Sequence, residues 1–292
     1  MKRLPLTLVL IAAAGLAAAQ DVRISLTRPE VTLSTHVTKV FIADPKDKLF
    51  VPPRVSEIPN NAYGDLVRLG RNIFVDTQHY ARRYVGNGLN CSNCHIGEGR
   101  TPGAMPLWAA YNIYPLYRGK NLRANSFPER IGECFRYSLN GLVPTRDSIE
   151  MKALIAYAQW LSATVPMRQV MTGRGVPGAP TVREPSPDRG EIIYRYQCAI
   201  CHGHNGAGVK RADGAGYQFP PLWGSDSYDK GAGLNKLRTG AGFIRANMPP
   251  GKGFSLSGQD AMDVSLYLHL QDRPWDPRIG WFSVFMSELA DG

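Results

Sequence analysis

The sequence contains two copies of the motif C-x-x-C-H, whose side chains can hold a metal cofactor. The first copy supplies Cys91, Cys94 and His95, and the second supplies Cys198, Cys201 and His202. Two thiols at this spacing form thioethers to the two vinyl groups on one edge of a haem, and the imidazole that follows lies beneath the iron as its proximal ligand. The motifs therefore predict two covalently bound haem c groups.

A single copy of this motif is also compatible with a thioredoxin-like redox pair or with half of a zinc site. The two copies begin 107 residues apart, at Cys91 and Cys198, and neither has a second C-x-x-C close to it. This arrangement disfavours both alternatives.

The sixth ligand of each iron sets its potential and its reactivity. In a class I cytochrome c arrangement this ligand comes from a loop shortly before the closing helix. Met248 lies 46 residues after His202 and stands directly before two prolines. We expect His/Met ligation there, which favours the reduced iron and raises the potential. The alternatives are a core methionine at this position and a nitrogen ligand from Lys210 or Lys230.

The corresponding place in the first half of the chain holds a cysteine. Cys134 lies 39 residues after His95, and it has no disulfide partner if the other four cysteines form thioethers. Coordination to ferric haem as a thiolate would protect it from oxidation. Thiolate donation stabilises ferric iron, so we expect the lower potential at this haem. The alternatives are a buried structural cysteine and ligation by Met105 or Met151.

A nucleophilic sulfur ligand suits a substrate that is itself a sulfur anion. Basic side chains surround Cys134 in the sequence: Arg100, Arg118, Lys120, Arg123, Arg130 and Arg136. Together with nearby hydroxyl and amide donors they suit an anion pocket at a haem edge. The expected substrate contacts are Lys120, Arg123, Arg130 and Ser138. The alternative is a solvated basic face.

The N-terminus has the pattern of an export signal. Two basic residues precede an apolar run from Leu4 to Leu16, and small residues follow up to Ala19. We predict a signal peptide and an exported, periplasmic or extracytoplasmic mature protein without a transmembrane segment. The formal charge of +10 suits an anion or an acidic partner, while export argues against nucleic acid as a partner.

Two helices must position each haem motif. Residues 70–74 (GRNIF) and 190–194 (GEIIY) share the pattern G-x-x-I-aromatic, which in small c-type cytochromes packs against a closing helix. We expect the closing helices at 148–164 and 257–270, the first capped around Asp147 or Ser148 and the second by a capping-box-like pair, Ser257 and Asp260. The expected apolar positions are Met151, Leu154, Ile155, Ala158 and Leu161 in the first and Val264, Leu266, Tyr267 and Leu270 in the second.

The 292 residues are 43% hydrophobic and 20% charged, which excludes a disordered chain, a collagen and a coiled coil. We predict a mainly α fold with two class I cytochrome c-like haem domains, joined by a Pro/Gly-rich linker and preceded by an N-terminal extension. The expected segments are a signal peptide (1–19), an N-terminal extension (20–60), a first domain with the catalytic haem (61–165), a linker (166–187), a second domain with the electron-exit haem (188–275) and a C-terminal tail (276–292).

The segment CFRYSLNG at 134–141 resembles the dihaem thiosulfate dehydrogenase family, as do YRGKN at 117–121 and NMP at 247–249. The resemblance implies oxidation of two thiosulfate ions to tetrathionate, a reaction that can also run in reverse. It implies a catalytic haem with His/Cys ligation and an exit haem with His/Met ligation. The electrons would pass to an external acceptor such as a small cytochrome c or another high-potential carrier.

By this resemblance, His95 and Cys134 are ligands of the catalytic haem, and His202 and Met248 are ligands of the exit haem. Some relatives have a lysine immediately before this methionine. Asn247 stands there in this chain, so we expect the methionine to remain bound in both redox states.

Our hypothesis is that thiosulfate enters the basic pocket, that Cys134 leaves the iron and forms a transient S-sulfonated adduct, and that a second thiosulfate attacks this adduct.

Two other functions remain open. One is a dihaem electron-transfer cytochrome without a substrate of its own, in which Cys134 tunes the potential. The other is a cytochrome subunit of a complex that conjugates thiosulfate to a carrier protein. A dihaem peroxidase is disfavoured, because no acid–base constellation stands near either motif.

Overall fold

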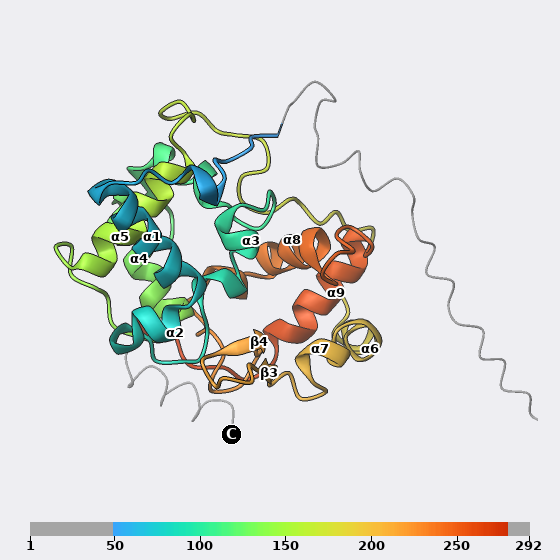
Figure 1. The fold of residues 1–292 in the computed structure, drawn as a ribbon. Helices are drawn as coiled ribbons and strands as arrows, with labels where there is room; N and C mark the ends of the chain where they lie inside the picture. Colours follow the sequence, from blue (N-terminus) through green and yellow to red (C-terminus); the bar gives the residue numbers. More distant parts are fainter. Residues whose placement is uncertain (1–48, 280–292) are drawn as a thin grey trace, which may run out of the picture. The chain divides into compact units, whose positions relative to one another are not determined.

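The computed structural model of the protein describes residues 49–279 (Figure 1). The predicted signal peptide, residues 20–48 of the predicted N-terminal extension and the part of the C-terminal tail beyond residue 279 lie outside this range.

Helices form most of the regular structure. The α-helices are α1 (Ala62–Val75), α2 (Thr77–Tyr80), α3 (Ile96–Gly99), α4 (Phe127–Glu133), α5 (Ile149–Leu161), α6 (Pro187–Gln197), α7 (Ala199–His202), α8 (Leu237–Asn247) and α9 (Gly258–His269). A π-helical turn covers Cys134–Ser138. Short 3-10 helices lie at Val55–Glu57, Arg82–Tyr84, Cys91–Asn93, Leu107–Ala109, Tyr111–Ile113 and Gly233–Asn235.

In the first half of the chain, α1 packs against α5 at a glycine (Figure 1). A Cβ atom on Gly70 would lie 2.0 Å from the carbonyl oxygen of Ala153, so a larger residue would force the two helices apart. One turn further along α1, the ring of Phe74 lies 5.8 Å from that of Tyr157. The predicted packing through Gly70 and Phe74 is confirmed.

The second half repeats this crossing between α6 and α9, and α8 packs against α9 as well (Figure 1). A Cβ atom on Gly190 would lie 2.1 Å from the carbonyl oxygen of Asp263. The ring of Tyr194 lies 5.5 Å from that of Tyr267. The repeated sequence pattern thus corresponds to a repeated helix crossing.

Both closing helices begin where the sequence predicts. The hydroxyls of Ser148 and Ser257 accept hydrogen bonds from the amides of Met151 and Asp260, at 3.2 and 3.0 Å. However, α5 ends three residues earlier than predicted and α9 one residue earlier. Leu270 is 61% exposed. The prediction that Leu270 is an apolar packing position is therefore wrong, because the chain leaves the helix at this residue.

The segment between the halves, residues 166–186, contains no helix or strand. It forms hydrogen bonds to both halves of the chain. The Gly103 amide of the first half donates to the Gly173 carbonyl at 2.8 Å. On the other side, the Val182 amide donates to the side-chain oxygen of Gln259 at 3.0 Å. These bonds fix the Pro/Gly-rich segment to both halves.

A loop of the second half, residues 226–232, packs directly on the first half. The Gly88 amide donates to a carboxylate oxygen of Asp226 at 2.9 Å. The Asp229 amide donates to the carbonyl of Tyr137, at the same distance. The described parts of the two halves belong to one compact unit.

Residues 49–279 also contain two short β-hairpins, which were not expected from the sequence. The strands are β1 (Leu116–Arg118) with β2 (Arg123–Asn125), and β3 (Val209–Lys210) with β4 (Tyr217–Phe219), both antiparallel. Strands of two or three residues are too short to show an alternating pattern. The first hairpin is relevant to the site, because its turn carries Lys120 and its second strand begins with Arg123.

Candidate haem centres

The first centre is built around His95, at the end of the first C-x-x-C-H motif. Its Nδ1 donates a hydrogen bond to the carbonyl oxygen of Met105 at 2.7 Å. This bond fixes the tautomer, so Nε2 carries the free lone pair that an iron requires. The ring of Phe74 lies 5.8 Å from the imidazole. Met105 was an alternative iron ligand, and it contributes its backbone carbonyl here.

Cys134 faces His95 from the end of α4. This helix starts at a capping box, in which Ser126 and Glu129 exchange hydrogen bonds. From Cys134 to Ser138 the chain continues as a single π-helical turn, a geometry that recurs at functional sites. The thiol lies within hydrogen-bonding reach of the His95 imidazole. A sulfur donor and a nitrogen donor thus face each other.

The environment of Cys134 favours its thiolate. Burial raises the pKa of this thiol, but the positive charge of Arg130 and the contact with His95 outweigh burial and bring the pKa to about 7. Arg130 Nη1 donates to Cys134 Sγ at 3.1 Å. The thiolate in return raises the pKa of Arg130. A substantial fraction of Cys134 is therefore ionised near neutral pH, which is the form that binds metals and attacks electrophiles.

The two cysteines of the first motif have the opposite environment. Burial raises the pKa of Cys91 and of Cys94 to about 12, and the nearby charge of Cys134 contributes to both shifts. The amide of Cys91 donates to the hydroxyl of the fully buried Thr77 at 3.1 Å. These surroundings suit an uncharged thioether sulfur.

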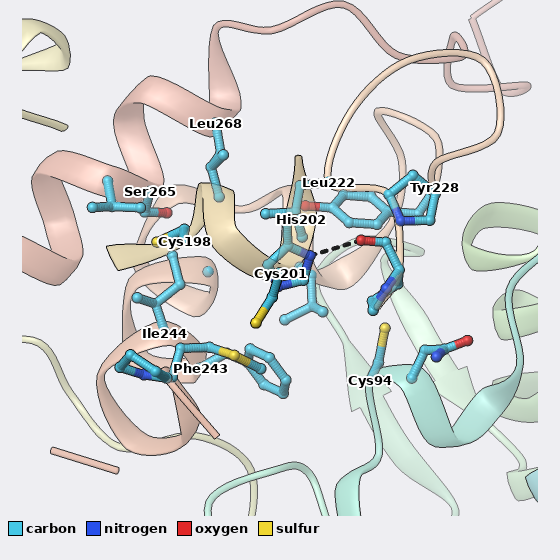
Figure 2. A pocket seen from close by; sticks show the side chains of 18 of the residues that line it. Cys94, Cys198, Cys201, His202, Leu222, Tyr228, Phe243, Ile244, Ser265 and Leu268 are labelled. Carbon is cyan, nitrogen blue, oxygen red and sulfur yellow. Dashed lines mark hydrogen bonds between the residues drawn. The ribbon is translucent and has the colours of Figure 1, made fainter. Parts of the chain in front are cut away.

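The second centre is a cavity lined by residues of α7, α8 and α9 (Figure 2). Its apolar walls include Leu222, Phe243, Ile244, Leu256, Val264 and Leu268. The sulfur and nitrogen donors Cys198, Cys201, His202 and Met248 line the same space. Cys94 of the first motif lines this cavity as well, so the two centres are neighbours.

His202 is held in the same way as His95. Its Nδ1 donates to the carbonyl oxygen of Pro220 at 2.8 Å, the dashed bond in Figure 2. Burial lowers the pKa of His202, so the imidazole is neutral and its Nε2 is free to bind iron. Met248 follows the last residue of α8, and its amide donates to the Ile244 carbonyl at 2.9 Å.

The other residues considered as sixth ligands lie elsewhere. Lys210 Nζ lies 5.9 Å from the ring centroid of Tyr217, and Lys230 Nζ lies 3.5 Å from that of Trp275. Met151 is 2% exposed and belongs to the core of the first half.

The donor sets of both centres fit haem c. Each centre supplies two cysteine sulfurs and a histidine whose Nε2 is free, and a further sulfur side chain lies with them. None of the five cysteines forms a disulfide in the described residues. At the first centre the further sulfur is the partly ionised Cys134, and at the second it is the uncharged Met248.

The four expected substrate residues differ in their positions. Arg130 donates to Cys134. Ser138 is half-buried and ends the same π-helical turn. The structure does not bring the other two into hydrogen-bonding contact with Cys134: Lys120 donates to the Gly231 carbonyl at 2.7 Å, and the exposed Arg123 pairs with Glu129 at 2.7 Å.

Glu133 lies beside the first centre, and it is not among the site residues expected from the sequence. Its carboxylate lies 3.5 Å from the guanidinium of Arg130 and 3.6 Å from that of Arg118, and it accepts a hydrogen bond from the side chain of Asn121. It therefore offsets part of the positive charge beside Cys134. Its position directly before Cys134 in the sequence is the feature from which its place at this centre could have been predicted.

Asn247, directly before Met248, links the two halves. It is 8% exposed, and its amide nitrogen donates to the Gly103 carbonyl of the first half at 3.0 Å. A second bond from the same nitrogen goes to the Phe243 carbonyl at 2.9 Å. The Asn247 side chain is thus buried and hydrogen-bonded to two backbone carbonyls.

The fold and the two donor sets define a c-type cytochrome that holds haem c. Residues 185–268 match the family model described as cytochrome C oxidase, cbb3-type, subunit III. The chain is also similar to the thiosulfate dehydrogenase of Stutzerimonas stutzeri strain A1501, with 49% identity over 80% of this chain and 76% of that protein. The thiosulfate dehydrogenase of Thiomonas intermedia strain K12 is 42% identical over 95% of this chain and 87% of its own length.

A solved structure supports the same relationship. The thiosulfate dehydrogenase (TsdBA) from Marichromatium purpuratum, in its as-isolated form, aligns with a TM-score of 0.77 and 39% identity over 80% of this chain. This chain spans about half of that longer chain, 51%. The chain belongs to the thiosulfate dehydrogenase family, and it is an oxidoreductase.

Among residues 49–279, no helix has both the length and the apolar character that crossing a membrane would require.

Proposed function

We propose that this chain oxidises thiosulfate to tetrathionate at the first centre and passes the electrons through the second centre to an external acceptor. The observation that carries the proposal is the contact of Cys134 with Arg130 and His95. It combines an ionisable sulfur nucleophile with a cation that attracts anions. The similarity to proteins named thiosulfate dehydrogenase supports the choice of substrate.

We assign a haem c to each centre, so the protein holds two. His95 and Cys134 are the proposed iron ligands of the first, and His202 and Met248 those of the second. Haem c, when bound, supplies a one-electron acceptor at each centre. The neutral His202 and the thioether of Met248 favour reduced iron, whereas the thiolate of Cys134 favours oxidised iron.

The chain's own residues bind and orient the anion. Thiosulfate carries two negative charges, and Arg130 presents its guanidinium fork beside Cys134 Sγ. Glu133 limits the surplus of positive charge, so a product of the same charge as the substrate can leave. Lys120, Arg123 and Ser138 remain predicted contacts.

In the proposed chemistry, the Cys134 thiolate forms a bond to the outer sulfur of one thiosulfate. The products of this step are an S-thiosulfonate, Cys–S–S–SO₃⁻, and two electrons, which leave one at a time. The S-sulfonate expected from the sequence, Cys–S–SO₃⁻, would lack one of the sulfur atoms that tetrathionate needs. The outer sulfur of a second thiosulfate then attacks the sulfur next to the cysteine sulfur. The Cys134 thiolate is released and tetrathionate forms, so two thiosulfate ions yield one tetrathionate and two electrons.

The test uses the fully oxidised, haem-loaded protein under anaerobic conditions. Thiosulfate is added, and the reduced-haem absorption band and the tetrathionate concentration are followed in one sample. We expect prompt haem reduction, with one tetrathionate for every two electrons taken up. The proposal is wrong if thiosulfate reduces neither haem in a protein whose haems still accept electrons from dithionite.

The alternative functions make different predictions in that experiment. A cytochrome without its own substrate would show no thiosulfate-dependent reduction, but it would exchange electrons with an acidic partner in a salt-dependent way. A subunit that conjugates thiosulfate to a carrier protein would purify with a second subunit and form no free tetrathionate.

We further infer export and a division into two haem domains, with the linker at 166–187. Cleavage after Ala19 predicts a mature chain that begins at Gln20. N-terminal sequencing of the protein from the periplasmic fraction tests this. An intact Met1 in that fraction would contradict cleavage.

A further inference from the structure

Arg273, which follows α9, is a buried cation without a counter-charge. It is 6% exposed. Its Nη2 donates to the Leu268 carbonyl at 2.6 Å, but Nε and Nη1 have no hydrogen-bond partner among residues 49–279. Within the same range, Arg273 belongs to none of the ion pairs. A buried guanidinium in this state is costly unless another group completes it.

A role in capping the C-terminus of α9 does not explain why the whole guanidinium of Arg273 is buried. The bond to Leu268 uses one of its nitrogens, and the other two remain without partners. Arg273 also lines the cavity of the second centre, which otherwise has mostly apolar walls. Arg273, whose Nε and Nη1 have no hydrogen-bond partner in the described part of the chain, therefore lines the cavity in which a haem would be bound.

Haem has one kind of anionic group that could complete this cation, its two propionate carboxylates. They lie on the edge opposite to the vinyl groups that the cysteines bind. In Figure 2, Cys198 and Tyr228 are on opposite sides of His202. Arg273 stacks on Tyr228, with its Cζ 4.5 Å from the ring centroid. Arg273 therefore lies near the side of the cavity where the propionates belong.

We propose that Arg273 binds a propionate carboxylate of the haem in the second centre and raises the reduction potential of that haem. The inference rests on the proposed assignment of a haem to this cavity and does not depend on thiosulfate as the substrate. Reduction adds a negative charge to the haem, so a nearby fixed cation stabilises the reduced state. A guanidinium suits a carboxylate because its planar fork can donate two parallel hydrogen bonds.

The location gives this charge a second consequence. Asn93 and Cys94 of the first motif line the same cavity as Arg273 and Tyr228. The cation thus lies close to the boundary between the two centres. There it favours the arrival of an electron at the second centre.

The experiment compares the haem-loaded wild type with Arg273→Gln, Arg273→Lys and the control Arg238→Gln. Arg238 is an exposed residue of α8, and its replacement removes the same charge from the surface of the same half. The haem content of each protein is measured first. Spectroelectrochemical titration then gives the two midpoint potentials, and resonance Raman spectroscopy reports the propionate bending band.

We expect Arg273→Gln to change the reduced-to-oxidised ratio of the higher-potential haem about tenfold toward the oxidised form, a negative shift of about 59 mV. Its propionate band shifts as well. Arg273→Lys should leave the midpoint potential of this haem close to the wild-type value, because the positive charge remains. Its propionate bending band should still shift, because lysine lacks the planar guanidinium fork. Arg238→Gln leaves both readouts unchanged.

Other results overturn the inference. If Arg273→Gln lowers only the thermal stability and leaves the potential and the band unchanged, Arg273 does no more than close α9. If Arg273→Gln does not incorporate haem, Arg273→Lys decides, and a wild-type band in that variant refutes the contact. A wild-type protein that carries only one haem contradicts the haem assignment itself, whatever Arg273 does.

Discussion

The two candidate haem centres share their helix crossing and the way their histidine is held, and they differ in the further sulfur side chain that lies with the histidine. His95 and His202 each donate Nδ1 to a backbone carbonyl, at 2.7 and 2.8 Å. At the first centre the facing group is Cys134, with Arg130 beside it. At the second centre Met248 lines the same largely apolar cavity as His202.

This comparison shows how one scaffold can serve two purposes. The thiol of Cys134 has a pKa near 7 and can ionise, bind metal or attack a sulfur atom. The thioether of Met248 does not ionise and is a much weaker nucleophile. Under the proposed function, chemistry at the first centre and electron transfer at the second would follow from this one sulfur side chain and the charge next to it.

The largest expected effect comes from exchanging the facing residues one at a time. Cys134→Ala should lower thiosulfate turnover at least about 10³-fold while both haems stay attached, because the nucleophile is lost. Met248→Ala should slow steady turnover but leave the thiosulfate-dependent reduction of the first haem in place. Stopped-flow spectroscopy of both variants checks this. Full turnover by a haem-loaded Cys134→Ala protein would remove the chemical distinction between the centres.

The second effect concerns the glycine at the helix crossing that both halves share. Gly70→Ala and Gly190→Ala should each lower the free energy of unfolding by about 3 kcal/mol, because each added Cβ would meet a carbonyl oxygen of the facing helix. Urea denaturation of the haem-loaded protein measures both. Gly119→Ala is the control, since a Cβ there has no atom within 4 Å. A large loss for only one of the pair would show that the two crossings are not equivalent.

The third effect separates the contribution of a cation that contacts Cys134 from that of a predicted contact that is exposed and paired with another side chain. Arg130→Gln should lower kcat/KM for thiosulfate about 30-fold, the size of a charge-assisted hydrogen bond lost beside a buried anion. Arg123→Gln should change it less than about twofold, because that guanidinium is exposed and paired with Glu129. Steady-state kinetics at several salt concentrations check both. Equal losses would mean that only the general basic charge attracts the substrate.

The smallest effect concerns the contact between the halves. Burial raises the pKa of the Asp229 carboxyl from 3.8 to about 7. Between about pH 4 and pH 7 the folded protein keeps a proton that the unfolded chain has released, so the free energy of unfolding falls as the pH rises through this window. Asp229→Asn should flatten that slope. It should also stabilise the protein by at least about 1 kcal/mol at pH 8, because the neutral amide is not penalised by burial as the carboxylate is.

Denaturation curves of the haem-loaded protein at several pH values test this last prediction. Asp226→Asn is the control, because Asp226 lies in the same loop and also bonds to the first half. It should lower the stability because it weakens the bond to the Gly88 amide, and the slope between pH 4 and pH 7 should persist because Asp229 is still present. An unchanged slope in Asp229→Asn would contradict the titration of a buried carboxyl at this contact.

The sequence by itself determined the local features of the protein. The spacing of Cys91, Cys94 and His95 is a covalent requirement of haem c, so it is visible without a structure. The glycine at position 70 and the serine cap at position 148 follow from backbone sterics and from the unpaired amides of a first helical turn. Cys134 could be singled out because an odd cysteine remained after the two motifs.

Tertiary structure decided which charges act on these groups. Arg130 and Arg123 are equally basic in the sequence, yet Arg130 alone of the two donates to Cys134, because it lies one helical turn before it. Lys120 was expected at the anion site, and a hairpin turn brings its ammonium to the Gly231 carbonyl of the other half. Arg273 gave no signal in the sequence, because burial and missing partners are properties of the folded chain. Local spacing is encoded by neighbouring residues, whereas the field at a haem centre is a sum over residues that only the fold brings together.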